Sequence, residues 1–425
     1  MNTALPGVIT LFVLALSSGW EPAFGSTGAG DPSLVDVLFI SRFIGPQTGK
    51  IFDRMLDADP SITLTRVVMP GHSWIGTIGA DPQLMNRRMR IYMPRSYQQL
   101  VRSYDAVVLY EAPCGSAVYS QVFFDPRWMS WFVESVRREG MALEMWGGDA
   151  SWGGGGEGSY YSWGETILDD ILPFECYPGY NPDEAGILRP FFVDRQNPLA
   201  QLPWKDAGPV ELLNKVEPKM GARLIAKAIG PGTEYAWMAW WMQEKGKVLG
   251  DAQAFFSRGS MDRMYREWEW FPDFLVYKVY FGVGKPVPAD LLRAHRLRRE
   301  INGYLERVSL LVSLFEFADS LGANTRILYR NLDEINAKEK LAESYYRRDD
   351  HESCAAVFAK IHGELEELEL KAVRVKQATL LWVYTIEWLV VSGTSLTAGT
   401  VVWVLMIRKR LYKEAGTTRG SPLSI

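Results

Sequence analysis

Between residues 34 and 285 the chain alternates short apolar runs with longer amphipathic stretches. This alternation is typical of β-α-β units and predicts an α/β domain built on a mainly parallel sheet. The later strands are expected to form an added antiparallel part of the sheet. The expected strands are 35–40, 62–69, 104–110, 142–146, 224–228, 235–241 and 247–251; the expected helices are 49–57, 97–102, 125–139, 164–173 and 271–283; residues 191–204 are expected to be a loop.

The pattern changes after residue 290, where proline and strand signals become rare up to residue 376. Apolar residues there recur at helical spacing, as at Leu365 and Leu368. The pattern breaks near Asn324 and again at 347–350. We therefore predict a stalk of two or three helices, arranged as a hairpin or a small bundle.

Residues 378–407 form a long apolar run in which Glu387 is the only formal charge. About twenty such residues suffice to cross a bilayer, so the run is predicted to be a single transmembrane helix. Basic residues follow at 408–410, and by the positive-inside rule the tail of residues 408–425 is cytoplasmic. Small residues at Ser395 and Gly399 would allow another helix to approach, so a homo-oligomer is one expected arrangement.

The amino-terminal residues 1–25 resemble a secretory signal peptide, with an apolar core at 8–16 and a small-residue exit near Gly25. A buried amino-terminal strand or helix is the alternative. With a cleaved signal the chain is a single-pass type I protein of the cell membrane. Its large amino-terminal part would then be extracytoplasmic, on the outer side of the membrane.

The composition narrows the classes of partner. The net charge is -4 and no basic stripe appears outside the membrane-proximal tail, which argues against nucleic acid. The three cysteines, Cys114, Cys176 and Cys354, lack metal-ligand spacing, so no metal and no cofactor are expected. A Cys114–Cys176 disulfide is compatible with an oxidising compartment, and the sequence leaves it open.

The strand 142–146 runs straight into a glycine-rich turn. Open α/β sheets bind ligands beyond the carboxyl ends of their strands, and nucleophile elbows are sharp strand-to-helix turns bordered by small residues. The turn is therefore the main candidate for a ligand site, although Asp and Ser are also ordinary turn formers. The candidate ligand-binding residues are Gly147, Gly148, Asp149, Ser151, Trp152 and Gly153.

Four segments carry a resemblance to a known family: 93–100, 146–154, 197–204 and 246–250. In order, they are similar to the membrane-linked branch of the class I glutamine amidotransferase-like family, over residues 34–285. The resemblance implies a flavodoxin-like fold with three-layer, doubly wound α/β/α packing. It also implies a cysteine on the elbow, with a downstream histidine and carboxylate.

The chain departs from that family at its chemistry. The elbow at 145–149 has no Cys or Ser at its apex, and the downstream His-x-Glu pattern is missing. The remaining catalytic candidates are Cys114, Glu111 and Asp149. The most specific catalytic hypothesis pairs Cys114 with His72. The alternative is an isolated loop cysteine and an unrelated histidine, which is supported by the lack of any motif spacing between them.

We therefore expect a non-catalytic domain that binds a small ligand or an envelope protein partner, the latter through the stalk. The alternative is a hydrolase or amidase of the same superfamily with a non-standard site. A third interpretation is a purely structural role in surface assembly. The aromatic run 235–242 is expected to be core, with a stacking surface as its alternative.

Overall fold

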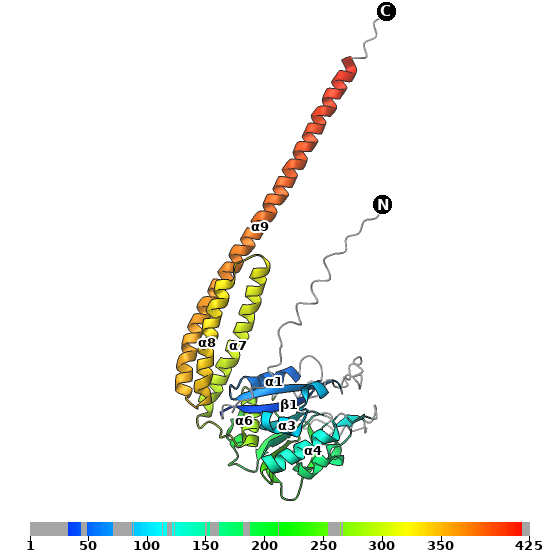
Figure 1. Cartoon of the computed structure of the whole chain (residues 1–425), viewed down its shortest axis with the longest axis vertical. Helices are drawn as coiled ribbons and strands as arrows, with labels where there is room; N and C mark the ends of the chain where they lie inside the picture. The colour runs from blue at the N-terminus through cyan, green and yellow to red at the C-terminus, as the bar shows by residue number, and fades with distance from the viewer. Residues whose placement is uncertain are drawn as a thin grey trace, which may run out of the picture. The chain divides into compact units, whose positions relative to one another are not determined.

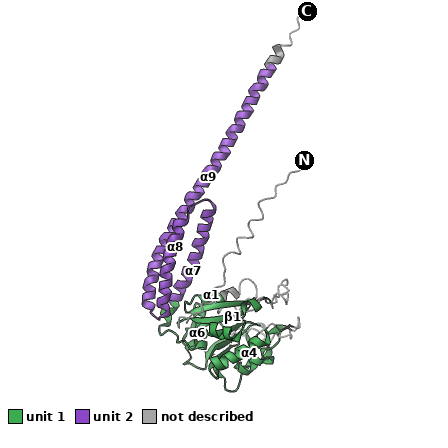
Figure 2. Cartoon of the chain, viewed as in Figure 1, with its two compact units in different colours: residues 1–295 green, residues 296–425 purple. Residues whose placement is uncertain are grey.

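The computed structural model describes residues 33–43, 49–70, 87, 89–112, 114–116, 121–122, 124–148, 151–153, 161–181, 188–210, 212–253, 264 and 267–418. The chain divides into two compact units, Met1–His295 and Arg296–Ile425 (Figure 2). The predicted signal peptide, His72 and Asp149 lie outside the described residues.

The first unit is built on an eight-stranded sheet in the order β2-β1-β3-β6-β12-β11-β10-β8. Strand β1 and helices α1, α3, α4 and α6 of this unit are labelled in Figure 1. Strands β2, β1, β3, β6 and β12 pair in parallel, and β11, β10 and β8 continue the sheet in antiparallel pairing. The prediction of a mainly parallel α/β sheet is confirmed. The strands are β1 Val35–Phe43, β2 Ile62–Pro70, β3 Ala106–Tyr110, β6 Ala142–Trp146, β8 Arg189–Phe192, β10 Arg223–Gly230, β11 Thr233–Gln243 and β12 Gly246–Asp251.

Strands β3 and β6 lie in the middle of the sheet and are buried at every position. Parallel strands covered on both faces become nearly continuous apolar runs, and Ala106–Tyr110 contains apolar or aromatic residues only. In β6 the single charged residue is Glu144, which is fully buried. The centre of the sheet therefore carries the core of this unit, with one carboxyl group inside it.

The helices of the first unit are α1 Gly49–Asp57, α3 Tyr97–Ser103, α4 Pro126–Glu134 and α6 Phe271–Val283. Helices α1 and α6 pack together, and the ring centroids of Phe52 and Phe271 lie 5.4 Å apart. Most of α6 is buried, including the charged Asp273 and Lys278. A helix that is buried on all sides is a core element rather than a surface helix.

Two predicted boundaries in this unit are wrong. The expected helix 164–173 is a pair of short 3₁₀ turns, Trp163–Glu165 and Ile167–Ile171, because the Thr166 side chain caps the second turn and Pro173 follows it. The first residues of the expected loop 191–204 belong to β8. This strand lies at the edge of the sheet, where proline is tolerated although it has no N–H to donate, and it contains Pro190.

Four short strands lie outside the main sheet and were not predicted. Strand β7, Phe174–Asn181, pairs with β9, Leu213–Pro218, to form a two-stranded ribbon, called here the β7–β9 ribbon. A second small pair joins β4, Gly115–Ser116, to β5, Gln121–Val122. The aromatic run 235–242 contributes Trp237 to the core, packed edge-on against Trp204 at 5.5 Å between ring centroids.

The described residues of the second unit form most of α7, Leu291–Ser320, together with α8, Arg326–Arg347, and α9, His351–Thr418. Their buried apolar positions recur mostly in steps of three and four, which is the heptad spacing of coiled-coil packing; the steps from Tyr304 to Leu311 in α7 and from Ile335 to Ala342 in α8 are seven. The predicted breaks near Asn324 and at 347–350 are confirmed. The buried apolar positions of this unit are Leu297, Ile301, Tyr304, Leu311, Phe315 and Ala318 in α7; Leu328, Leu332, Ile335, Ala342 and Tyr346 in α8; and Cys354, Phe358, Ile361, Leu365, Leu368 and Ala372 in α9; the polar residues Arg298, Glu339 and His351 are buried as well.

Helix α9 extends without interruption beyond the α7–α8 hairpin (Figure 2). Residues 384–413 of this helix are all exposed, and the helix is long and apolar enough here to cross a membrane. Large side chains such as Trp388, Leu396 and Trp403 are 64% to 75% exposed there. By length and composition this part of α9 could cross a membrane, and the predicted span is continuous with the stalk part of the same helix.

Candidate functional site

The candidate site lies where the three neighbouring strands β3, β6 and β12 end, at Tyr110, Trp146 and Asp251. The backbone joins these ends directly: Gly147 N donates to Asp251 O at 2.7 Å. Gly147 has to be glycine, because an added Cβ would lie 2.6 Å from a backbone oxygen of the segment that follows β12. The first glycine of the turn therefore lets two strand ends approach each other.

The second glycine, Gly148, is held by the β7–β9 ribbon. The Asn214 side chain accepts from Gly148 N at 3.2 Å and donates to Gly148 O at 3.0 Å. The hydroxyls of Ser151 and Tyr180 also donate to Gly148 O, at 3.2 and 3.3 Å. Both backbone groups of Gly148 are thus bonded within the protein.

Trp152 and Gly153 complete the described part of the turn. Trp152 is fully buried, and its indole donates to Asp251 O at 3.1 Å. Its φ of 54° lies in the left-handed region, a conformation that costs energy for a bulky residue. Gly153 packs against backbone, since an added Cβ would lie 1.9 Å from Tyr177 O in β7. The sequence-predicted residues of this turn are therefore brought together, and all five described ones are buried.

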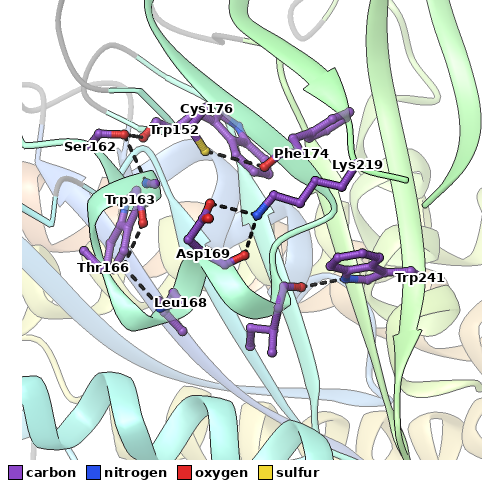
Figure 3. Close-up of polar contacts among 12 residues, drawn as sticks. Trp152, Ser162, Trp163, Thr166, Leu168, Asp169, Phe174, Cys176, Lys219 and Trp241 are labelled. Carbon is purple, nitrogen blue, oxygen red and sulfur yellow. Dashed lines mark hydrogen bonds and ion pairs between the residues drawn. The ribbon is translucent and has the colours of Figure 1, made fainter. Parts of the chain in front are cut away.

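The segment 161–173 anchors the turn from a third side (Figure 3). Ser162 Oγ and Trp163 N both donate to Trp152 O, at 3.2 and 2.8 Å. Asp169 in the same segment forms an ion pair with Lys219 at 2.8 Å. Trp241 on β11 donates its indole N–H to Ile171 O at 2.6 Å. This segment thus fastens the turn both to the end of the ribbon and to the sheet.

Glu111 follows β3 and is almost fully buried, at 1% exposure. Its φ of 46° is left-handed, and its side chain lies against Gly148, where an added Cβ would come 1.9 Å from Glu111 Cγ. Non-glycine residues held in this region are found preferentially at functional sites. Glu111 and the glycine turn, both named as candidates from the sequence, therefore form one cluster.

Cys114 is buried, and its Sγ donates to Tyr161 O at 3.1 Å. Burial raises the pKa of the Cys114 thiol to about 12. Cys176 is also a free thiol, as is Cys354, so no Cys114–Cys176 disulfide is formed. Within the part of the chain that the structure describes, no hydrogen bond joins Cys114 to a histidine.

Below this edge, the face of the sheet that α6 covers holds a charged pair that the sequence did not reveal. Lys278 Nζ contacts Asp251 Oδ2 at 2.8 Å, and both side chains are 0% exposed. The ammonium also lies 3.8 Å from the Trp146 ring centroid, a cation–π contact. Burial lowers the pKa of Lys278, and the Asp251 carboxylate opposes that shift. The only available signals were one Asp at a strand end and one Lys within an apolar helix.

Glu144 lies on the same face, next to that pair. Its Oε2 accepts from Trp146 Nε1 at 2.8 Å, and its Oε1 has no hydrogen-bond partner among the described residues. Burial raises the pKa of Glu144 to about 7, against the lowering effect of Lys278. Gly282 on α6 makes room for this carboxyl, since an added Cβ would lie 2.3 Å from Oε1.

A second polar pair in this unit joins α6 to the start of α7. His295 Nδ1 lies 2.7 Å from Asp273 Oδ2, and the His295 ring stacks on Trp270 with centroids 4.0 Å apart.

For metal ions, the described residues contain no group of three or more His, Cys, Asp and Glu side chains with suitable geometry.

No family model matches the chain, and no curated protein matches it. Solved structures similar to it include two cytoplasmic proteins of Salmonella typhimurium: STM1381 from strain LT2, at 18% identity and TM-score 0.43, and STM3548, at 16% and 0.42. Each match covers 58% of this chain, and 99% and 98% of those chains. A ThuA-like protein of Parabacteroides merdae has 13% identity and TM-score 0.37, over 60% of this chain and 94% of its own. These likenesses assign neither a family nor an activity.

Proposed function

We propose that this chain is a membrane-anchored, extracytoplasmic domain of the amidotransferase-like, doubly wound α/β/α type that binds its target without cleaving it. The target is a small ligand or an envelope protein. The binding face is the carboxyl edge of the sheet around residues 147–153, together with the β7–β9 ribbon that holds it. Helix α9 supplies the tether, with the tail of residues 408–425 in the cytoplasm.

The state of the Cys114 thiol is the observation that carries this proposal. A cysteine hydrolase attacks with a thiolate, which requires a neighbouring base or a positive environment. Cys114 is buried, donates to a backbone carbonyl and has a pKa raised to about 12. A thiol with that pKa is protonated at neutral pH. The turn after β6, where the amidotransferases that the sequence resembles carry their thiol, has glycines instead.

Tyr177 gives the proposed face an exposed aromatic side chain. It lies on β7, directly over Gly153, and is 44% exposed. Tyrosine suits recognition because it buries a large area while its hydroxyl keeps a polar contact. The described residues of the turn, 147–148 and 151–153, are buried, so recognition on this face falls to the ribbon beside them.

Site-specific photo-crosslinking tests the binding role. A photo-reactive phenylalanine analogue at Tyr177, in the full chain in native membranes, is expected to yield one discrete adduct. The matched control places the analogue at Met220, which is fully exposed on the turn between β9 and β10. Equal labelling from both positions, or none from Tyr177, would contradict the proposed face.

The hydrolase alternative is favoured by one observation, the left-handed φ of Glu111 beside Gly148. A strained, buried carboxylate at a strand end is the kind of group that enzymes hold ready for acid-base chemistry. Ammonia release from glutamine and from simple amides by the purified full chain separates the two functions. Turnover that is lost in Glu111→Gln or Cys114→Ser would establish an enzyme and overturn the binding-only proposal.

A further inference from the structure

The turn between α7 and α8 lies at the level where the apolar span begins. Lys376 Nζ on α9 is 5.5 Å from the Phe317 ring centroid near the end of α7. The span predicted from the sequence starts two residues later, at Ala378. We call residues 317–327, which contain this turn, the hairpin tip.

Contacts along the helices fix this register. Arg307 on α7 bonds Glu369 on α9 at 2.7 Å, and Phe317 meets Lys376, so both helices run in the same direction. Helix α8 runs the opposite way, because Lys338 contacts Glu364 and the start of α8 follows the hairpin tip. The tip is therefore the end of the hairpin nearest the span.

The length of the apolar run places the hairpin tip against lipid headgroups. Residues 378–407 of a straight helix are about 45 Å long at 1.5 Å per residue. A bilayer with its headgroup regions is about 40–45 Å thick, and its hydrocarbon core is about 30 Å. The run therefore matches the whole thickness, and its first residues lie in the headgroup layer. The hairpin tip, at the same level, meets that layer.

The chemistry of the hairpin tip fits this layer. Phe317 and Ile327 are 45% and 59% exposed, although both are apolar. The basic side chains Arg326 and Arg374 are exposed at the same end, beside the half-buried Lys376. Apolar side chains combined with basic ones are what interfacial membrane contacts use, because the former enter the headgroup boundary and the latter pair with phosphate. Two acidic residues, Glu316 and Asp319, are also present.

We infer that the hairpin tip is a second membrane contact, in which Phe317 and Ile327 enter the headgroup layer of the leaflet around α9 and the adjacent basic side chains bind lipid phosphate. This inference rests on the membrane anchoring in the proposed function. Its consequence is orientation: a helix bundle that touches the bilayer at its tip as well as through α9 is held at a fixed angle to the membrane.

The experiment uses the full chain in phospholipid vesicles, with an environment-sensitive fluorophore on a single introduced cysteine. Cys114 and Cys354 are buried and Cys176 is replaced by serine in every variant, so labelling is selective. In Ile327→Cys the label is expected to be quenched by lipids that carry a nitroxide on the headgroup. The matched control, Leu341→Cys, is on the same helix at 48% exposure, about 21 Å further from the tip. We expect at least about twice as much quenching at position 327, given that separation.

A third label, Leu396→Cys, tests the span itself with nitroxides deep in the acyl chains. No quenching at position 396 would refute the anchoring and with it the proposed function. Quenching at 396 with equal signals at 327 and 341 would refute the hairpin-tip contact alone. A label at 327 that reports an apolar environment in vesicles but is not quenched by the headgroup nitroxides would indicate a protein partner, such as a second copy, and would also overturn the lipid contact.

Discussion

The two units bury their cores in different ways. The α/β unit encloses Lys278 and Asp251, both 0% exposed, under aromatic side chains. The core of the helical unit is nearly apolar, and its buried positions recur mostly every three or four residues along each helix. In the first unit the burial of a charged side chain depends on a partner that is far away in the sequence. In the second unit the burial of a side chain depends on its position in the helical repeat.

This difference has an energetic consequence. The Asp251 carboxylate accepts hydrogen bonds from Lys278 Nζ, from Trp237 Nε1 at 3.0 Å and from the backbone N–H of Gln253 at 3.0 Å. Removing one partner leaves a charge inside a medium of low polarity, which costs more than the pair itself contributes. A heptad position loses only its own packing when it is truncated.

Lys278→Met is expected to have the largest effect. The methionine leaves Asp251 buried and unpaired with a cation, so the free energy of unfolding should fall by about 3–5 kcal/mol. Denaturant titration followed by tryptophan fluorescence measures it, because Trp146 lies directly against the ammonium. The double variant Lys278→Met/Asp251→Asn should recover part of this loss, since the stranded charge is removed as well.

A surface pair supplies the control for that experiment. Lys227 and Glu234 are joined at 2.7 Å with side chains 35% and 56% exposed. Lys227→Met should change the free energy of unfolding by less than about 1 kcal/mol, the usual range for exposed ion pairs. A comparable loss in both variants would mean that burial is not what makes Lys278 important.

Leu365→Ala tests the helical unit. This residue is 0% exposed in α9, and its truncation should lower the stability of the bundle by about 3 kcal/mol through lost burial and a cavity. Leu370→Ala, at 56% exposure on the same helix, should be nearly neutral. Hydrogen exchange should show faster opening of α7 and α8, with unchanged protection in β3 and β6. If the sheet opened too, the two units would not be independent.

Glu144→Gln probes the buried carboxyl by its pH dependence. Burial raises the pKa of Glu144 to about 7 from an ordinary value of 4.5, so the folded state holds a proton that the unfolded state has lost. Its contribution to stability is complete below about pH 4.5 and is lost as the pH rises through 7, on the order of 3 kcal/mol in total. Glu144→Gln should flatten this part of the stability profile. An unchanged slope between pH 5 and 8 would show that Glu144 does not titrate there.

The sequence predicted the parts of the fold that follow local rules. Strand 142–146, helix 271–283 and a stalk of two or three helices were predicted correctly, because hydrophobic periodicity and proline or glycine boundaries determine them. The β7–β9 ribbon was missed, because its strands are partly exposed and are stabilised by pairing with each other. Local pattern carries no information about such pairing.

The residues of the candidate site were named from the sequence, but their contacts were not. Gly147, Gly148 and Glu111 were named because they follow strand ends. That Asn214 would occupy both backbone groups of Gly148 depends on a contact between residues 66 positions apart. The Lys278–Asp251 pair, 27 positions apart, was missed for the same reason.

Glu339→Leu is expected to have the smallest effect on stability. It is also the most diagnostic change, because Glu339 is a buried ionisable residue within the otherwise nearly apolar core of the helical unit. Glu339 occupies a heptad position of α8 at 8% exposure, and burial together with Glu343 raises its pKa to about 8. Its favourable contribution is present at acidic pH and is lost as the pH rises through 8. Leucine should therefore stabilise the bundle by about 1–2 kcal/mol at pH 9, since an apolar residue replaces a buried charge, and by less at pH 5. Thermal unfolding of the full chain at both pH values measures the difference. A loss of stability at pH 9 would mean that the helical unit, like the sheet, depends on a buried polar contact.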